Sequence, residues 1–250
     1  MTQSKLDQNR EVGLKRLTLK DISPWNQYYI NTYFIFRDVQ YAAERYASGH
    51  LLDVGCGNKP YLEIFDNRVA SYVGCDVIQS NENVVDRICP ANDLSFDNET
   101  FETVFSTQVM EHVADFHGMV AECFRVLKNN GYGIFTIPFC WELHEEPYDF
   151  FRFTKYGLKE LFKKYNFEIV EIKSNGGKWA ALFQTAINIF FSTRKYKTFR
   201  SRIIKLIFIH FRFLYVYNRF AVWLDKKYFD DKLTLNYLVV VRKNALSKTQ

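Results

Sequence analysis

The sequence predicts an α/β protein built on a doubly wound, mostly parallel sheet, and three observations support this. Short apolar segments typical of buried strands alternate with segments of helical periodicity, which is the pattern of βαβ units. The segment Leu51–Gly57 has the pattern of a strand that runs into a glycine turn. A length of 250 residues, with 48% hydrophobic and 24% charged residues, suits one sizeable domain and excludes wholesale disorder or a coiled coil.

The expected elements follow in chain order. An aromatic-rich helix within residues 24–48 precedes the sheet, and further helices are expected at 120–127 and 154–165. All glycines and prolines lie at or before Gly177, so residues 178–231 are expected to form a helical insert between the sixth and seventh strands of a single domain, 1–250. The seven strands are expected at 51–54, 71–76, 84–88, 103–106, 132–139, 167–172 and 233–242.

Residues 172–224 differ from the rest of the chain in charge. They include ten Lys and Arg residues and no Asp or Glu, so the net charge of +5 comes from this segment and the remainder is mildly acidic. The segment also holds 13 of the 44 aromatic residues. Two helical faces are apolar: one carries Trp179, Leu182, Phe183, Ala186, Ile189 and Phe190, and the other carries Ile203, Ile204, Ile207, Phe208, Phe211, Leu214 and Tyr215.

Three interpretations of this insert remain open. Its apolar faces could pack on the sheet and on each other as a simple cap. Residues 178–224 could instead make peripheral contact with an anionic membrane, as basic amphipathic helices with Phe and Trp do. Nucleic-acid binding is the least favoured, because most of the aromatic residues stand beside Ile, Leu and Val rather than on an open stacking surface.

The cysteines and the N-terminus indicate a cytoplasmic protein. The five cysteines are scattered, with no Cys-x-x-Cys pair, so neither a disulfide framework nor a zinc site is expected. The first 21 residues are polar and charged and contain no secretory signal. The longest apolar stretch, 203–224, is interrupted by charged residues and makes a poor membrane span. A cytoplasmic protein that attaches peripherally to the inner face of the membrane is the second localisation that we keep open.

The glycine turn predicts a ribose-bearing cofactor. Gly55 and Gly57 permit positive φ and a close approach of ligand to backbone. Asp76 ends the next strand, 19 residues after Gly57, where a carboxylate can bind both ribose hydroxyls. The third glycine of a dinucleotide fingerprint is replaced by Pro60, which disfavours NAD, and no triphosphate-binding loop is present.

An ordered set of motifs resembles the class I S-adenosylmethionine-dependent methyltransferases, over roughly residues 30–175 and the last strand. The resemblance implies a Rossmann-like, seven-stranded sheet with an antiparallel last strand and S-adenosylmethionine as cofactor. The loop His144–Thr154 also resembles a bacterial subgroup linked to surface-polysaccharide synthesis. The matching segments are Leu51–Gly57, Tyr72–Asp76, Asp93–Phe96, Phe101–Val104, Gln108–Val113 and Arg125–Leu127.

The resemblance also assigns cofactor contacts. Gly55, Cys56 and Gly57 would line the methionine end, with Asp53 orienting its ammonium group. Asp76 would hold the ribose, and Gln108 would meet the methionine end from the fourth strand. One position departs from the family pattern: Pro90 stands where an acidic residue usually contacts adenine. Adenine recognition is therefore expected from backbone groups near Ala91 and Asn92, or from a displaced Asp93.

The catalytic prediction rests on side chains that follow the fourth and fifth strands, whose carboxyl ends face the ligand crevice. We expect His144, Asp149 and Glu111 to act in catalysis, with His144 as general base because imidazole titrates near neutrality. In the alternative interpretation His144 and Asp149 only pin the loop, with Arg152 paired to Asp149. His112 is interpreted as structural, and no metal ligands are expected. Glu145 and Glu146 are the remaining acidic candidates of this loop.

The predicted function is O-methylation of a sugar or lipid-linked glycan intermediate. The alternatives are an RNA-directed methyltransferase and a non-catalytic protein that binds S-adenosylmethionine and uses its insert for interactions. Amino-methylation of bases is disfavoured because Ser106–Val109 stands where the Asn/Asp-Pro-Pro-aromatic tetrad would be. Cys140 is interpreted as packing rather than as a nucleophile. The oligomeric state is left open.

Overall fold

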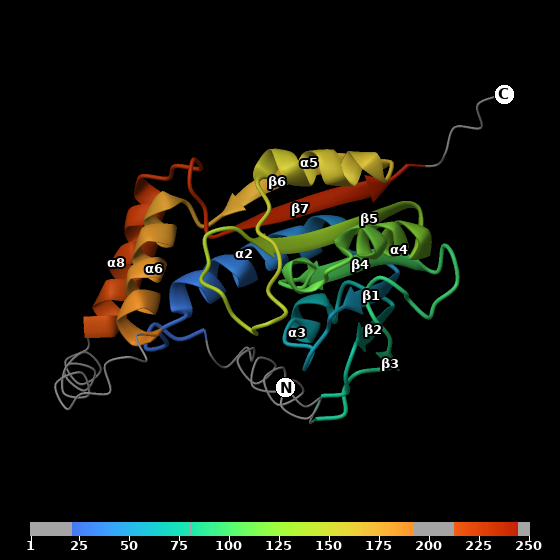
Figure 1. Cartoon of the computed structure of the whole chain (residues 1–250), viewed down its shortest axis with the longest axis horizontal. Coiled ribbons are helices and arrows are strands. Elements are labelled where there is room, and N and C mark those ends of the chain that lie inside the picture. The colour runs from blue at the N-terminus through green and yellow to red at the C-terminus, as the bar shows by residue number, and fades with distance from the viewer. Residues whose placement is uncertain (1–21, 81, 193–212, 245–250) are drawn as a thin grey trace.

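The protein is seen here as a computed structural model that describes residues 22–80, 82–192 and 213–244. A seven-stranded sheet with strand order β3-β2-β1-β4-β5-β7-β6 lies at its centre (Figure 1). Strand β7 is antiparallel to both of its neighbours, and the other pairs are parallel. The predicted fold class, with its mostly parallel sheet and antiparallel last strand, is therefore confirmed.

The strands lie close to the expected ranges. They are β1 (His50–Val54), β2 (Ser71–Asp76), β3 (Arg87–Ile88), β4 (Phe101–Thr107), β5 (Leu127–Pro138), β6 (Phe167–Asn175) and β7 (Asn236–Lys243). The helices are α2 (Tyr29–Tyr46), α3 (Leu62–Phe65), α4 (Phe116–Val126), α5 (Lys155–Lys164), α6 (Lys178–Ser192) and α8 (Phe213–Lys227), with a 3-10 turn η2 (Met110–His112).

Helices cover both faces of the sheet, which explains why its strands are apolar on both sides. On one face α2 and α3 pack Val39 and Phe65 into a cluster with Phe105 of β4. On the other face α4 and α5 contribute Met119 and Phe162 to the larger cluster. The sheet is thus buried over its centre, and its exposed side chains lie on the edge strands and at strand ends.

Several strands differ from their expected bounds, β5 the most. Strand β5 begins at Leu127 rather than at residue 132, directly after α4 ends. The sequence Asn129–Gly131 lies in an irregular part of β5, where the register to β4 shifts and Asn130 has φ +66°. The third strand is shorter than expected because only Arg87 and Ile88 pair with β2.

The two described helices of the insert pair at the sheet edge that carries the ligand crevice. Strand β6 is parallel to β5, since both are antiparallel to β7, so α6 starts where the carboxyl ends of the parallel strands lie. Asp225 of α8 caps α6: its carboxylate accepts hydrogen bonds from the backbone of Gly177 (3.0 Å) and Ala180 (2.9 Å). The two ends of the insert meet, because the Lys178 N–H donates to the Asp230 carbonyl at 3.0 Å.

The apolar face that the periodicity indicated on α6 points outward. Leu182 is 55% and Ile189 63% exposed, whereas the buried face carries Ala180, Ala181, Ile187 and two polar residues. Those two are Gln184, which donates to the Gln27 carbonyl (2.9 Å), and Asn188, which accepts from Gln184. This face of α6 therefore does not pack on the sheet, although its Phe183 packs against Tyr217 of α8, as the cap interpretation allowed.

Most of the second apolar face lies within residues 193–212, outside the described residues. Seven of the ten basic residues of 172–224 lie there as well. Among the helices that the structure describes, none has the length and hydropathy needed to cross a membrane.

Candidate functional site

A pocket of about 450 Å³ opens at the carboxyl ends of β1, β2 and β4, the usual ligand position in an open parallel sheet. All of the residues that we predicted to bind the cofactor line this pocket. They are Asp53, Gly55, Cys56, Gly57, Asp76, Ala91, Asn92 and Gln108.

The glycine turn that follows β1 is a close fit to its surroundings. Gly55 has φ +77°, and a Cβ atom there would lie 2.3 Å from a methyl carbon of Val109. The backbone N–H groups of Gly55 and Cys56 both donate to the Cys75 carbonyl, and that of Gly57 donates to the Asp76 carboxylate at 3.0 Å. The turn is therefore fixed to the end of β2, with its backbone facing the pocket.

Asp53 is a buried carboxylate with one uncommitted oxygen. Its Oδ2 accepts a hydrogen bond from the Tyr72 hydroxyl at 2.5 Å, while Oδ1 is buried and has no hydrogen-bond partner within the described part of the chain. Burial raises the pKa of Asp53 to about 7. A buried acceptor without a partner, at the wall of a pocket, fits a cationic group such as the ammonium of S-adenosylmethionine.

After β3, beside the carboxyl end of β2, Pro90, Ala91 and Asn92 line the pocket and Asp93 does not. Of the two options that we kept for the adenine contact, this geometry favours the segment 91–92. Asp115 also lines the pocket here and was not predicted from the sequence. It is the N-cap of α4 and accepts from the backbone of Gly118 at 2.9 Å, so an N-cap motif was the signal available in the sequence.

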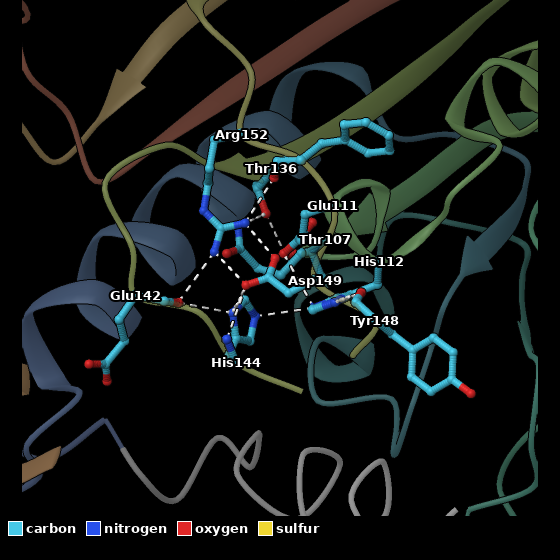
Figure 2. A network of polar contacts seen from close by, with 11 residues as sticks. Thr107, Glu111, His112, Thr136, Glu142, His144, Tyr148, Asp149 and Arg152 are labelled. Carbon is cyan, nitrogen blue, oxygen red and sulfur yellow. Dashed lines mark hydrogen bonds and ion pairs between the residues drawn. The ribbon is translucent and has the colours of Figure 1, made fainter. Parts of the chain in front are cut away.

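The far wall is formed by η2 and by the loop that follows β5. His112, Glu145, Tyr148 and Phe150 line the pocket there, whereas the predicted catalytic residues Glu111, His144 and Asp149 do not. His112, which we interpreted as structural, thus lines the pocket, and His144 contacts His112 without lining the pocket itself. Figure 2 shows how His144, His112 and Glu111 lie in one network of side chains.

Both nitrogens of His144 are occupied. Its Nδ1 lies 3.1 Å from Oδ2 of Asp149, and its Nε2 lies 3.1 Å from Nε2 of His112. Burial, followed by the neighbouring His112, lowers the pKa of His144 to about 4. These contacts do not favour the prediction that His144 takes a proton directly from an acceptor, since another imidazole separates it from the pocket.

Asp149 holds the loop together. It pairs with both terminal nitrogens of Arg152 (2.5 and 2.7 Å) and accepts from the backbone N–H of His144 at 3.0 Å. Hydrogen bonds from the Arg152 side chain and the His144 N–H hold the pKa of Asp149 below its usual value against the opposing effect of burial. This geometry corresponds to the alternative in which Asp149 positions the loop.

Glu111 lies inside the same cluster. Its side chain is fully buried, neither carboxylate oxygen has a hydrogen-bond partner among the described residues, and burial raises its pKa to about 8. Its Oε1 lies 3.7 Å from Nε2 of His112, whose Nδ1 is 2.8 Å from the Tyr148 carbonyl. Glu111, His112 and His144 bring three possible ligand atoms within 4.8 Å of one another, a grouping that our sequence expectation of no metal ligands did not anticipate.

Sequence comparison places a known domain over this region. Residues 52–135 match the family model described as a methyltransferase domain. The ubiquinone biosynthesis O-methyltransferase of Mesorhizobium japonicum is 32% identical over 102 residues, which are 36% of this chain and 41% of that protein. The mitochondrial enzyme of the same name from Bos taurus is 33% identical over 97 residues, 32% of this chain and 26% of that protein. The chain thus spans less than half of these relatives.

Comparison with solved structures supports the fold over most of the chain. The cyclase SpnF superposes with a TM-score of 0.56 at 20% identity and covers 84% of this chain and 81% of its own. Geranyl diphosphate methyltransferase, solved in complex with SAM, superposes with a TM-score of 0.53 at 11% identity. The match covers 86% of this chain and 90% of that one. At these identities the structures show a shared fold alone. Because SpnF carries a different activity on this fold, the chemistry has to be argued from the site.

Proposed function

We propose that this chain, which carries an S-adenosylmethionine-dependent methyltransferase domain, methylates a hydroxyl oxygen on a lipid-linked acceptor. One observation carries the proposal: a single pocket joins the glycine turn and the unsatisfied Asp53 at one wall to His112 and Glu145 at the other. When bound, S-adenosylmethionine supplies an electrophilic methyl group on its sulfonium. The residues of this chain must bind the cofactor, align the acceptor and remove its proton.

The cofactor end of the pocket is assigned as follows. Asp53 would neutralise the ammonium group of S-adenosylmethionine, and the backbone of Gly55–Gly57 would line its methionine portion. The Asp76 carboxylate would bind the ribose hydroxyls. Gln108 has φ +56° and donates through Nε2 to Thr136 at 3.2 Å, a restrained position that supports its role beside the methionine.

The acceptor end has three ionisable side chains, His112, Glu145 and Tyr148, on the wall formed by η2 and the loop that follows β5. A hydroxyl must lose its proton as it attacks, so this wall is where we place the proton acceptor. His144 and Asp149 then act as positioning residues, because they contact His112 and the loop rather than the pocket.

Two observations support the choice of acceptor. The curated relatives are named O-methyltransferases, which favours oxygen as the methylated atom, although the match covers about a third of this chain. The loop His144–Thr154 resembles a subgroup linked to surface polysaccharides, so we propose a sugar of a lipid-linked glycan intermediate. An intermediate of ubiquinone biosynthesis, RNA, or no acceptor at all would each give a different experimental result.

The test is to incubate the purified protein with methyl-labelled S-adenosylmethionine and a fractionated cell extract. We expect label in the lipid extract, released into water by mild acid that cleaves the glycan from its lipid. Label that stays with the lipid would indicate an isoprenoid phenol, and label in RNA would favour the RNA-directed alternative. If the cofactor binds and no fraction is labelled, the proposal is wrong and the non-catalytic alternative stands. Asp53→Asn serves as the control with impaired cofactor binding.

We further propose that the insert makes peripheral contact with an anionic membrane through residues 178–224. The described helices expose a run of aromatic rings: Phe183 and Phe220 lie 5.8 Å apart, and Phe220 stacks on Trp223 at 5.6 Å. Lys227 lies 5.1 Å from the Trp223 ring. Aromatic rings bordered by cations suit the headgroup layer of an anionic membrane, where a lipid-linked acceptor would reside.

Vesicle co-sedimentation checks this contact. The protein should bind vesicles that contain phosphatidylglycerol. The double change Phe220→Glu and Trp223→Glu should lower the partition coefficient at least tenfold, since loss of even one partly buried ring is worth roughly 1.4 kcal/mol or more. Tyr156→Glu, at an exposed aromatic on α5, is the matched control and should leave binding unchanged. Equal binding by the double variant and the control would contradict the proposal.

A further inference from the structure

We propose that Glu111, His112 and His144 form a binding site for a divalent transition-metal ion, zinc in the first place, at the acceptor wall of the pocket. We infer further that this ion holds the acceptor hydroxyl, a second step that rests on the proposed function. The three residues come from two places in the chain: Glu111 and His112 from η2, and His144 from the loop that follows β5 (Figure 2).

The spacing of the ligand atoms fits a metal. Two ligands at about 2.1 Å from a tetrahedral zinc ion lie roughly 3.4 Å from each other. Here the two Nε2 atoms of His112 and His144 are 3.1 Å apart, and Oε1 of Glu111 is 3.7 Å from Nε2 of His112. The three side chains therefore converge on one point without rearrangement of the backbone.

The hydrogen-bond acceptors beside the two imidazoles indicate which ring nitrogen carries the hydrogen and which carries the lone pair. Nδ1 of His112 lies 2.8 Å from the Tyr148 carbonyl, and Nδ1 of His144 lies 3.1 Å from the Asp149 carboxylate. Each acceptor favours a hydrogen on Nδ1, which leaves a lone pair on each Nε2. Two lone pairs that face each other at 3.1 Å repel unless a proton or a metal ion lies between them. A carbonyl or carboxylate behind a ligating histidine is the usual support of a metal site.

Glu111 provides an independent observation. The carboxylate is completely buried, and neither of its oxygens accepts a hydrogen bond from any described residue. Arg152, the basic residue of this cluster, donates to Asp149 instead. The ionised form of a buried carboxyl group that has no hydrogen-bond donor is costly, and a cation that displaces its proton removes that cost. Because this carboxylate is directed at the two Nε2 atoms, the cation belongs between them.

The donor set indicates the kind of ion. Two imidazole nitrogens and one carboxylate suit zinc, iron and related transition metals, whereas calcium and magnesium prefer oxygen ligands. Three protein ligands leave a fourth position open, as in catalytic zinc sites. Since His112 is the ligand that lines the pocket, the open position faces the acceptor.

The role of the ion follows from this position. A hydroxyl bound to the metal releases its proton more readily, and the proton passes to the Glu145 carboxylate, which lines the same wall. The O–H electron pair stays on the oxygen, which is then aligned as the nucleophile.

Metal binding is tested on the full chain after chelation and removal of the chelator. Calorimetric titration with zinc should show one tight equivalent, and saturating zinc should raise Tm by about 5 °C or more. Glu111→Gln and His144→Ala should each weaken zinc binding at least tenfold. His50→Ala changes an exposed histidine far from the site in sequence and should bind zinc as the wild type does. Cobalt bound in place of zinc should show no thiolate charge-transfer band. The absence of this band distinguishes the proposed site from adventitious binding by cysteine.

Cofactor binding by the same variants reports whether they remain folded, because S-adenosylmethionine would bind at the other wall. Unchanged zinc affinity in Glu111→Gln and His144→Ala, with cofactor binding retained, would overturn the proposal, as would a thiolate spectrum. If zinc binds as expected and no methyl transfer occurs, the metal site stands and the proposed function fails. If chelated protein that binds no zinc still transfers methyl groups at the full rate, the proposed function stands and the metal site fails.

Discussion

Replacing Gly55 by alanine should lower the affinity for S-adenosylmethionine by about 100-fold, equivalent to about 2.8 kcal/mol. The added Cβ would lie 2.3 Å from Val109, at a φ of +77° that L residues rarely adopt. Left-handed backbone costs roughly 1–2 kcal/mol and overpacking typically a further 1–3 kcal/mol. The turn must therefore shift, and its N–H groups move away from the Cys75 carbonyl. Equilibrium dialysis with labelled cofactor measures the affinity, and urea unfolding measures the accompanying loss of stability.

The matched control is Gly157→Ala in the first turn of α5. This glycine has ordinary helical backbone, and its added Cβ would meet only the Thr154 hydroxyl at 3.2 Å. Alanine favours helix over glycine by about 1 kcal/mol, so the control should keep both affinity and stability. If Gly55→Ala binds the cofactor as tightly as the control does, the pocket that we describe is not the cofactor site.

Replacing Asp53 by asparagine should weaken cofactor binding 10- to 100-fold at pH 8 and remove most of its pH dependence. In the wild type, the pKa of Asp53 near 7 means that the carboxylate is increasingly ionised as the pH rises through 7. Only the ionised form attracts an ammonium group, so wild-type affinity should rise between about pH 6 and pH 8. The variant has no such group, and its affinity should be flat over this window. Calorimetry at several pH values distinguishes the two profiles.

The same residue should affect the stability of the cofactor-free protein with the opposite sign. Its pKa is raised from 3.8 to about 7 on folding, so the folded state retains a proton that the unfolded state releases. Stability contributed by Asp53 is therefore present below about pH 4 and is lost as the pH rises toward 7, by about 2–4 kcal/mol. Relative to wild type, Asp53→Asn should gain stability over that range, whereas Asp66→Asn, at an exposed position, should not. A parallel pH profile for both variants would contradict the assignment.

Features that depend on neighbouring residues in the chain could be predicted from the sequence. The strand that ends at Val54, the glycine turn and the acidic end of β2 are local patterns, and all eight proposed cofactor positions lie on one pocket. The parallel sheet follows from the order of those patterns, since consecutive strands with helical crossovers leave few topologies.

Features that depend on distant contacts could not be predicted. His112 and His144 are 32 residues apart and meet only because the loop that follows β5 folds back over η2, so no metal-ligand spacing is visible in the sequence. The sequence likewise could not predict which face of α6 is buried. Its helical period identifies an apolar face, but Gln184 and Asn188 are buried because Gln184 reaches the Gln27 carbonyl before α2. That partner lies 157 residues away.

The closure of the insert by Lys178 and Asp230 has a consequence for how this protein can be altered. The chain leaves the sheet after β6 and returns to β7 at almost the same point, with the backbone bond of 3.0 Å and the side-chain bond of 2.6 Å spanning the gap. The length of the intervening segment is therefore not constrained by the sheet, and the entropic cost of closing it grows only slowly with length. A segment of different length could therefore be joined at 177 and 231 without changing the sheet, provided that it also covers the residues of α2 on which α6 and α8 pack.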